Sequence, residues 1–243
     1  MFTVKSVLET GSTNDDAARV LGEPGSEGLV ILASHQREGH GRHTRRWVAP
    51  PGSGLLFTMI APRRVAASAL WAVPFWTALA VADGIAEYDV TVGLQWPNDL
   101  LLDGRKCGGI LCISRVAGPE AWIGCGVGLN VHRPAADAEL DRLDPRPAFL
   151  DEAAPRIDLT ALFGAILAAF AQSFDQLDRP NTVARAWEAR AGLRGTPYRL
   201  QIDGEPAPFD AIADRLSPEG GLVVISEGRE RTIALADARV FRG

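Results

Sequence analysis

VGLQWPNDLLLDGRKCGGILCISRV, residues 92–116, has the pattern of two extended segments joined by a tight turn. Apolar runs lie on both sides of Asp103-Gly104, and Asp-Gly favours the two-residue turn of a β-hairpin. AWIGCGVGLNV, residues 121–131, has the composition of a further strand. Strands that follow one another through short connections predict a sheet of mainly antiparallel type.

The segments around this hairpin predict more strands and several helices. Residues 28–34 and 53–62 are short apolar runs typical of buried strands, and a long polar loop separates them. Ser12 precedes a helical pattern with an acid three residues on, which predicts a capping box. Residues 66–88 predict a buried helix around Pro74, and a helix with one apolar face begins at Asp158. We therefore expect an α+β fold, with helices packed on a mixed, mostly antiparallel sheet.

The C-terminal quarter has a different sequence pattern from the rest of the chain. After Trp187 the chain reads as short strands punctuated by Gly-containing turns, which predicts a small β-barrel. We expect two domains, residues 1–188 and 189–243. Residues 132–156, rich in Pro, Ala and Asp, predict an irregular connection inside the first domain.

Composition restricts the class of protein. The 243 residues are 47% hydrophobic and carry a net charge of -5, which argues against a nucleic-acid partner. We identify no signal peptide and no stretch apolar enough to span a bilayer, so we expect a cytoplasmic protein with no membrane partner. Its three cysteines, an odd number in apolar segments, predict reduced, buried thiols.

HQREGHGRHTRRW, residues 35–47, packs four arginines, three histidines and two glycines into one loop. Arginine donates from a planar, permanently charged group, and glycine lets a backbone approach a ligand closely, so the loop suits an anionic small molecule. A solvated surface loop is the alternative. The histidine spacing matches no metal site.

A carboxylate and an ammonium group flank the hairpin turn. Asn98 and Asp99 precede the first strand, and Lys106 follows the turn. Asp99 suits Mg²⁺, which prefers carboxylate oxygens and substrate phosphates, and Lys106 suits a phosphate or carboxylate. The same residues also fit a plain turn. No Walker sequence or dinucleotide-binding fingerprint occurs.

Four segments occur one after another along the chain. They are STN at 12–14, Q..GHGR..R.W at 36–47, WPND and GGIL within 96–111, and GVGLN at 126–130. Together they resemble the catalytic core of the biotin protein ligases, in the biotin/lipoate protein ligase superfamily. The resemblance implies a class II synthetase-like α+β domain with a small C-terminal SH3-like β-barrel. About ten residues precede the first segment, so we expect no N-terminal DNA-binding domain of the repressor type.

The resemblance also implies a reaction. Biotin and MgATP would form biotinyl-5′-AMP, and a lysine of a biotin carboxyl carrier protein would then take the biotin. By position, the implied catalytic residues are Arg42 and Lys106. The implied biotin-binding residues are Ser12, Thr13, Gln36, Gly39, Gly41, Trp47 and Gly109. The implied nucleotide-binding residues are His40, Arg45, Trp96, Asn98, Asp99 and Asn130, with Asp99 also a ligand of Mg²⁺.

Three positions depart from the family's usual pattern. His40 stands where the family has Arg, Thr44 where it has Gly, and Gln95 where it has Lys. Histidine is mostly neutral at pH 7, so His40 would weaken a phosphate contact or make it depend on pH.

Two alternatives stay open beside the ligase. One is acyl transfer of the lipoate or octanoate type, and the other is a non-catalytic ligand-binding relative. Cys107 adjoins Lys106, but neighbouring strand residues point to opposite faces, which argues against a Cys-Lys dyad. Relatives occur as monomers and as dimers that pair sheet edges, so a homodimer is a further expectation.

Overall fold

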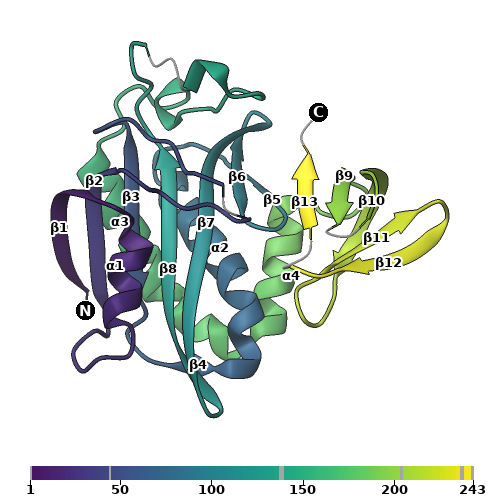
Figure 1. The fold of residues 1–243 in the computed structure, drawn as a ribbon, viewed down its shortest axis with the longest axis horizontal. Coiled ribbons are helices and arrows are strands. Elements are labelled where there is room, and N and C mark those ends of the chain that lie inside the picture. The colour runs from purple at the N-terminus through teal and green to yellow at the C-terminus, as the bar shows by residue number, and fades with distance from the viewer. Residues whose placement is uncertain (1, 44, 137–139, 203–204, 236–237, 242–243) are drawn as a thin grey trace.

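The computed structural model describes residues 2–43, 45–136, 140–202, 205–235 and 238–241 (Figure 1). Its main sheet has the strand order β1-β2-β3-β8-β7-β6-β5, and β4 pairs with β8 at one end. The β1–β2 pair is parallel and the other ladders are antiparallel, which confirms the expected mixed sheet. The strands are β1 (Thr3–Thr10), β2 (Leu29–Gln36), β3 (Gly54–Ile60), β4 (Val65–Ala66), β5 (Gly93–Gln95), β6 (Asp99–Leu102), β7 (Arg105–Ala117) and β8 (Glu120–Asn130).

The predicted hairpin forms β6 and β7, next to the edge strand β5 of this sheet. β6 and β7 are joined at Asp103 and Gly104, whose φ angles of 48° and 74° are the left-handed values that a type I′ turn requires. β7 pairs with β8 from Gly108 opposite Leu129 to Ala117 opposite Glu120. This register places Gly109 of β7 opposite Gly128 of β8, and both glycines line a cavity on the sheet.

Helices cover the two faces of the sheet unequally (Figure 1). Behind it lie α2 (Val73–Ala86), α3 (Leu159–Ser173) and α4 (Pro180–Ala191), while α1 (Thr13–Val20) lies in front. Short 3₁₀ helices are η1 (Ala67–Ala72), η2 (Leu140–Arg142), η3 (Leu150–Glu152) and η4 (Phe174–Asp178). α3 begins as expected at Asp158, whose Oδ1 accepts a hydrogen bond from Ala161 N at 2.8 Å.

The helices bury apolar surface on both faces. On the rear face, the rings of Phe57 and Phe163 are 5.3 Å apart, and those of Trp76 and Phe170 are 5.1 Å apart. On the front face, α1 is held by a small cluster of Ala17, Leu21, Ile31 and Ile60. The small footprint of α1 leaves the strand ends beside it to be covered by loops.

Ser12 does not form the expected capping box. It is the N-cap residue of α1, but its side chain makes no capping hydrogen bond. Asp15, which would close the box, has its Oδ2 at 2.9 Å from His40 Nε2 instead. Ser12 lines a cavity instead.

The expectation about membrane-spanning stretches was wrong by length and composition. The helical segment Ala67–Ala86 has a mean hydropathy of 1.5 and is long enough to cross a bilayer. It is also 67% buried inside the protein, packed between the sheet and α3. Such burial is typical of the core helix of a globular domain.

A second sheet follows α4, with the order β12-β11-β10-β9-β13 and antiparallel pairing throughout. This small antiparallel sheet fits the expected SH3-like architecture. Its strands are β9 (Pro197–Ile202), β10 (Phe209–Leu216), β11 (Leu222–Ser226), β12 (Arg229–Ile233) and β13 (Ala238–Phe241).

Trp96 joins the second sheet to the main one. Its Nε1 donates to Gly220 O and its backbone N donates to Tyr198 Oη, both at 3.2 Å. The proposed boundary between residues 188 and 189 lies within α4.

The three cysteines are free thiols. Cys107 and Cys125 are buried as expected, while Cys112 is partly exposed. Burial raises the pKa of Cys107 to about 12. Cys107 packs in the core behind the sheet while Lys106 lines a cavity in front, so these neighbours point to opposite faces.

Candidate active site

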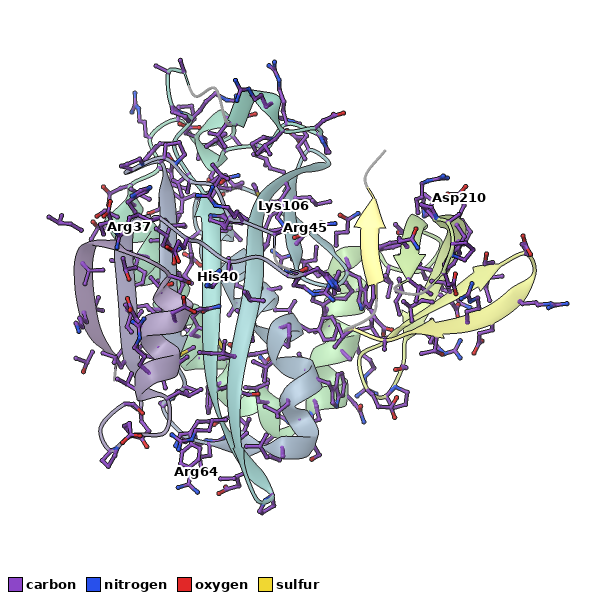
Figure 2. All side chains as sticks on the ribbon, viewed as in Figure 1. Arg37, His40, Arg45, Arg64, Lys106 and Asp210 are labelled. Atoms are coloured by element: carbon purple, nitrogen blue, oxygen red, sulfur yellow. The ribbon has the colours of Figure 1, made fainter. Side chains whose placement is uncertain are left out.

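A cavity of about 130 Å³ lies on the front face, where α1 begins and where β2 and β6 meet the loop 37–47. Figure 2 shows His40, Arg45 and Lys106 around this region, in front of β7 and β8. The structure brings most of the predicted site residues together here: Ser12, Thr13, Gln36, His40, Gly41, Arg42, Arg45, Trp47, Asn98, Asp99, Lys106 and Gly109. Segments up to about a hundred residues apart in sequence therefore form one site.

Three predicted residues do not line this cavity. Gly39 packs against another part of its own loop, because a Cβ at Gly39 would lie 2.7 Å from Trp47 O. Trp96 is fully buried, with its indole N–H donated to Gly220. Asn130 lines a neighbouring cavity, and its Nδ2 donates to Ala148 O at 3.3 Å.

One end of the cavity is lined by neutral polar groups. Thr13 donates to Gln36 Oε1 twice, from its backbone N at 2.7 Å and from its hydroxyl at 3.0 Å. Asn14 donates from Nδ2 to Leu111 O at 2.9 Å. With Ser12, these hydroxyl and amide groups can recognise an uncharged polar ring through directed hydrogen bonds.

Trp47 forms a wall because two glycines lie beneath it. Gly109 and Gly128 are paired across β7 and β8, and each faces the indole. A Cβ at Gly128 would lie 2.7 Å from Trp47 Cε2, and one at Gly109 would lie 3.1 Å from Cζ3. Both glycines are required by close packing rather than by a turn.

The other end of the cavity is cationic. Lys106 forms an ion pair with Asp99, and its Nζ lies 5.5 Å from the centre of the Trp47 ring. Burial, and then the nearby charges of Arg45 and Arg42, lower the pKa of Lys106 to about 8. The charged form of Lys106 is therefore destabilised by burial and by the two arginines, and a further anion in the cavity would stabilise it.

Arg42 reaches across to the second sheet. Its guanidinium donates to Leu235 O, and burial, followed by the charge of Arg45, lowers its pKa. Val240 of β13 also lines the cavity. The C-terminal sheet thus closes the cationic end of the site.

The loop that carries the arginines is held at several points. Gly41 N donates to Arg45 O at 2.7 Å, and Trp47 N donates to Gly39 O at 2.8 Å. His40 is tied to Asp15 of α1. Thr44, one of the departures from the family pattern, lies outside the described residues.

A larger cavity of about 370 Å³ adjoins the first. Arg45, Trp47, Asp99 and Lys106 line both cavities, so the cationic end is their junction. The predicted Asn130 lines the second cavity together with apolar residues: Val48, Leu140, Leu143, Pro145, Pro147 and Val240. Two ligands bound in the two cavities would meet at Lys106, which suits the joining of a carboxylate to a phosphate.

Sequence reasoning missed several residues of this site, among them Asn14, Gly126 and Gly128 in the cavity lining and the buried Thr58 beneath it. Asn14 belongs to the STN segment, and the two glycines to GVGLN, but neither segment showed where those residues point. Thr58 carried the clearest signal, because it is the polar residue inside the apolar run GLLFTMI. A hydroxyl in a fully buried strand needs a partner.

Comparison with known proteins agrees with this geometry. The family model of the biotin/lipoate A/B protein ligase family matches residues 10–130. A biotin--[acetyl-CoA-carboxylase] ligase of Paracoccus denitrificans is 32% identical and covers 98% of this chain and 99% of its own length. The chain therefore belongs to the biotin/lipoate A/B protein ligase family.

Further relatives lie within the biotin ligases of that family. The biotin--[acetyl-CoA-carboxylase] ligase of Mycobacterium tuberculosis is 29% identical over 95% of this chain and 86% of its own. Among solved structures, the biotin protein ligase of Aquifex aeolicus in complex with biotin and ATP aligns over 100% of both chains, with a TM-score of 0.78 and 20% identity. That likeness confirms the fold.

Proposed function

We propose that this chain is an ATP-dependent biotin protein ligase, which forms biotinyl-5′-AMP and transfers biotin to a lysine of a biotin carboxyl carrier protein. One observation carries the proposal: a pocket with a neutral polar end joins a second cavity at a cationic junction. Biotin has the matching polarity, with an uncharged cyclic urea at one end and a carboxylate at the other.

The first cavity is assigned to biotin. Ser12, Thr13 and Gln36 would hydrogen-bond the cyclic urea, because neutral donors and acceptors suit an uncharged ring. Trp47 would lie against the ring system. The carboxylate would then reach Lys106 and Arg42, whose charges offset its own.

The second cavity is assigned to ATP. A carboxylate oxygen of biotin would attack the α-phosphorus, forming the acyl–phosphate bond as the bond to pyrophosphate breaks. Arg42 and Lys106 would stabilise the negative charge that grows on the phosphate, with Arg45 beside them. A lysine amine of the acceptor would next attack the acyl carbon, and AMP would leave with the bonding electrons.

Mg²⁺ belongs to this proposal as a companion of ATP. It prefers carboxylate and phosphate oxygens and commonly uses one or two protein carboxylates beside the phosphates of a substrate. Asp99, which lines both cavities, fits that requirement as one ligand. The ion would neutralise phosphate charge, while Asn98 and Asn130 would help to order the nucleotide. Gly39 and Gly41 would let the loop close over the adenylate and exclude water.

The structure argues against a cysteine-based acyl transfer. The Cys107 thiol faces the core, and its raised pKa disfavours the thiolate that a nucleophile needs. Among the described residues, the neutral polar end of the site fits the cyclic urea of biotin, a group that lipoate and octanoate lack.

The proposal is tested by calorimetric titration with biotin, and with lipoic and octanoic acids as competitors, before and after MgATP is added. Biotin binding that deepens with ATP, release of pyrophosphate, and biotinylation of a purified carrier domain seen by mass spectrometry would support it. Binding of another acid in place of biotin would refute it.

Two further parts of the proposal concern partners and location. β1 ends the main sheet and exposes Leu8 (86%) and Val4 (45%), so a homodimer would pair two β1 edges. Sedimentation of the protein and of Leu8→Lys tests that pairing. The location is proposed to be the cytoplasm, where the ATP that the reaction requires is available.

A further inference from the structure

A row of three residues crosses the sheet beneath the neutral end of the cavity. Thr58 of β3 pairs with Gly126 of β8, which pairs with Leu111 of β7. Asn14 spans this row: its Nδ2 donates to Leu111 O at 2.9 Å, and its Oδ1 accepts from Thr58 Oγ1 at 2.7 Å. Gly126 leaves the room for it, because a Cβ there would lie 2.3 Å from Asn14 Oδ1.

Thr58 also links Asn14 to the residues assigned to biotin. Its Oγ1 lies 2.9 Å from Thr13 Oγ1, and Thr13 in turn donates to Gln36 Oε1. The polar groups of Asn14, Thr58, Thr13 and Gln36 therefore form one continuous chain. Thr58 is its central member and is fully buried, while the other three line the cavity.

The protons of this chain can be counted. Both ends are fixed as acceptors: Gln36 Oε1 receives the Thr13 backbone N–H, and a flipped Asn14 amide would turn its oxygen against Leu111 O. Between them are three oxygen–oxygen separations of 3.0, 2.9 and 2.7 Å, but Thr13 and Thr58 supply one hydroxyl proton each. Because Thr58 can donate to only one of its two neighbours at a time, either Thr13 Oγ1 or Asn14 Oδ1 is left to accept an N–H group from a ligand.

We propose that Thr58 is a positioning residue for the neutral end of this site. It does not touch the ligand, but its hydroxyl holds Asn14 and Thr13 in the orientation that accepts an N–H group of a cyclic urea. The inference rests on the proposed function, since biotin supplies that urea. Loss of the hydroxyl removes one of the two protons and loosens both neighbours.

The test compares three variants of the full chain by calorimetry. Thr58→Val replaces the hydroxyl with a methyl group of similar size, and Thr58→Ser restores the hydroxyl. Thr77→Val is the matched control, because Thr77 is also fully buried and lies away from the cavity. Its hydroxyl donates to Val73 O of the same helix and lies 3.7 Å from Cys112 Sγ. Thermal unfolding of each variant is measured in parallel.

We expect Thr58→Val to raise the Kd of biotin about tenfold, which is about 1.4 kcal/mol, and to change the Kd of ATP by less than about twofold. Thr58→Ser should return the Kd of biotin to within about threefold of the unaltered protein, and Thr77→Val should leave it unchanged. This split between two ligands, with rescue by serine, would not arise from general loosening of the core.

Other outcomes overturn the inference in distinguishable ways. An unchanged Kd of biotin in Thr58→Val, or an equal loss of biotin and ATP binding, would overturn the role of Thr58 alone. Failure of the unaltered protein to bind biotin would overturn the proposed function and this role together.

Discussion

Lys106 gives the site a pH dependence whose sign and size follow from the structure. Burial, Arg45 and Arg42 lower its pKa from 10.5 to about 8, although Asp99 forms an ion pair with it. A lowered lysine pKa means that the proton is lost as the pH rises through about 8, and only the protonated form offers a cation to a carboxylate. The protonated fraction is about 0.9 at pH 7 and about 0.1 at pH 9. The apparent affinity for biotin should therefore fall about tenfold between pH 7 and pH 9.

The assay is calorimetric titration with biotin, whose own carboxylate does not titrate in this range. Binding should take up about 0.8 proton at pH 8.5 and about 0.1 at pH 7, read from the dependence of the heat on the ionisation enthalpy of the buffer. Lys106→Met should bind weakly and lose both effects. An affinity that is flat from pH 7 to pH 9, with heat independent of buffer, would refute the placement of Lys106 against the carboxylate.

Three further predictions follow from named contacts. Lys106→Ala should slow pyrophosphate release in the presence of biotin and MgATP by about 10²–10³ with unchanged circular dichroism, and an unaltered rate would exclude Lys106 from the chemistry. His40→Arg should lower the Kd of MgATP, measured by calorimetry, severalfold by adding a permanent charge. An unchanged Kd would show that no phosphate lies near residue 40. Gly84→Ala should lower the free energy of unfolding in urea by about 1–3 kcal/mol, because its Cβ would lie 2.6–2.8 Å from atoms of Ile166. The matched variant Gly164→Ala meets nothing within 4 Å and should gain up to about 1 kcal/mol, so equal losses in both would contradict the packing argument.

Local patterns predicted the β6–β7 hairpin and α3 well, and β1 and α4 poorly. The hairpin was readable because Asp103-Gly104 separates two apolar strands, and α3 because its apolar residues repeat with helical spacing. β1 was missed, since an exposed edge strand such as TVKSVLET has no buried face to impose alternation on its sequence. α4 was missed as well, because its apolar residues are few and its packing partner, the second sheet, is distant in sequence.

The resemblance to a family predicted which residues form the site, but only the structure shows how these residues contact one another. No local pattern shows that Gln36 bonds Thr13 or that Trp47 lies on Gly109 and Gly128. Such contacts join segments that meet only after the sheet has formed. The capping box at Ser12 failed for the same reason: a local motif was overridden by a long-range contact to the loop.

Two of the three departures from the family pattern, His40 and Gln95, lie within the described residues. His40 is 44% exposed at its side chain and is tied to Asp15, so the loop keeps its anchor to α1 without an arginine. Gln95 is paired with Asp99 across β5 and β6, where a lysine would add a second cation beside that carboxylate. The residues that would contact biotin, by contrast, match the family. His40 lines the cavity assigned to biotin, and Gln95 is paired with Asp99, which lines both cavities, so the two losses of charge should alter the affinity for the anionic groups of either ligand.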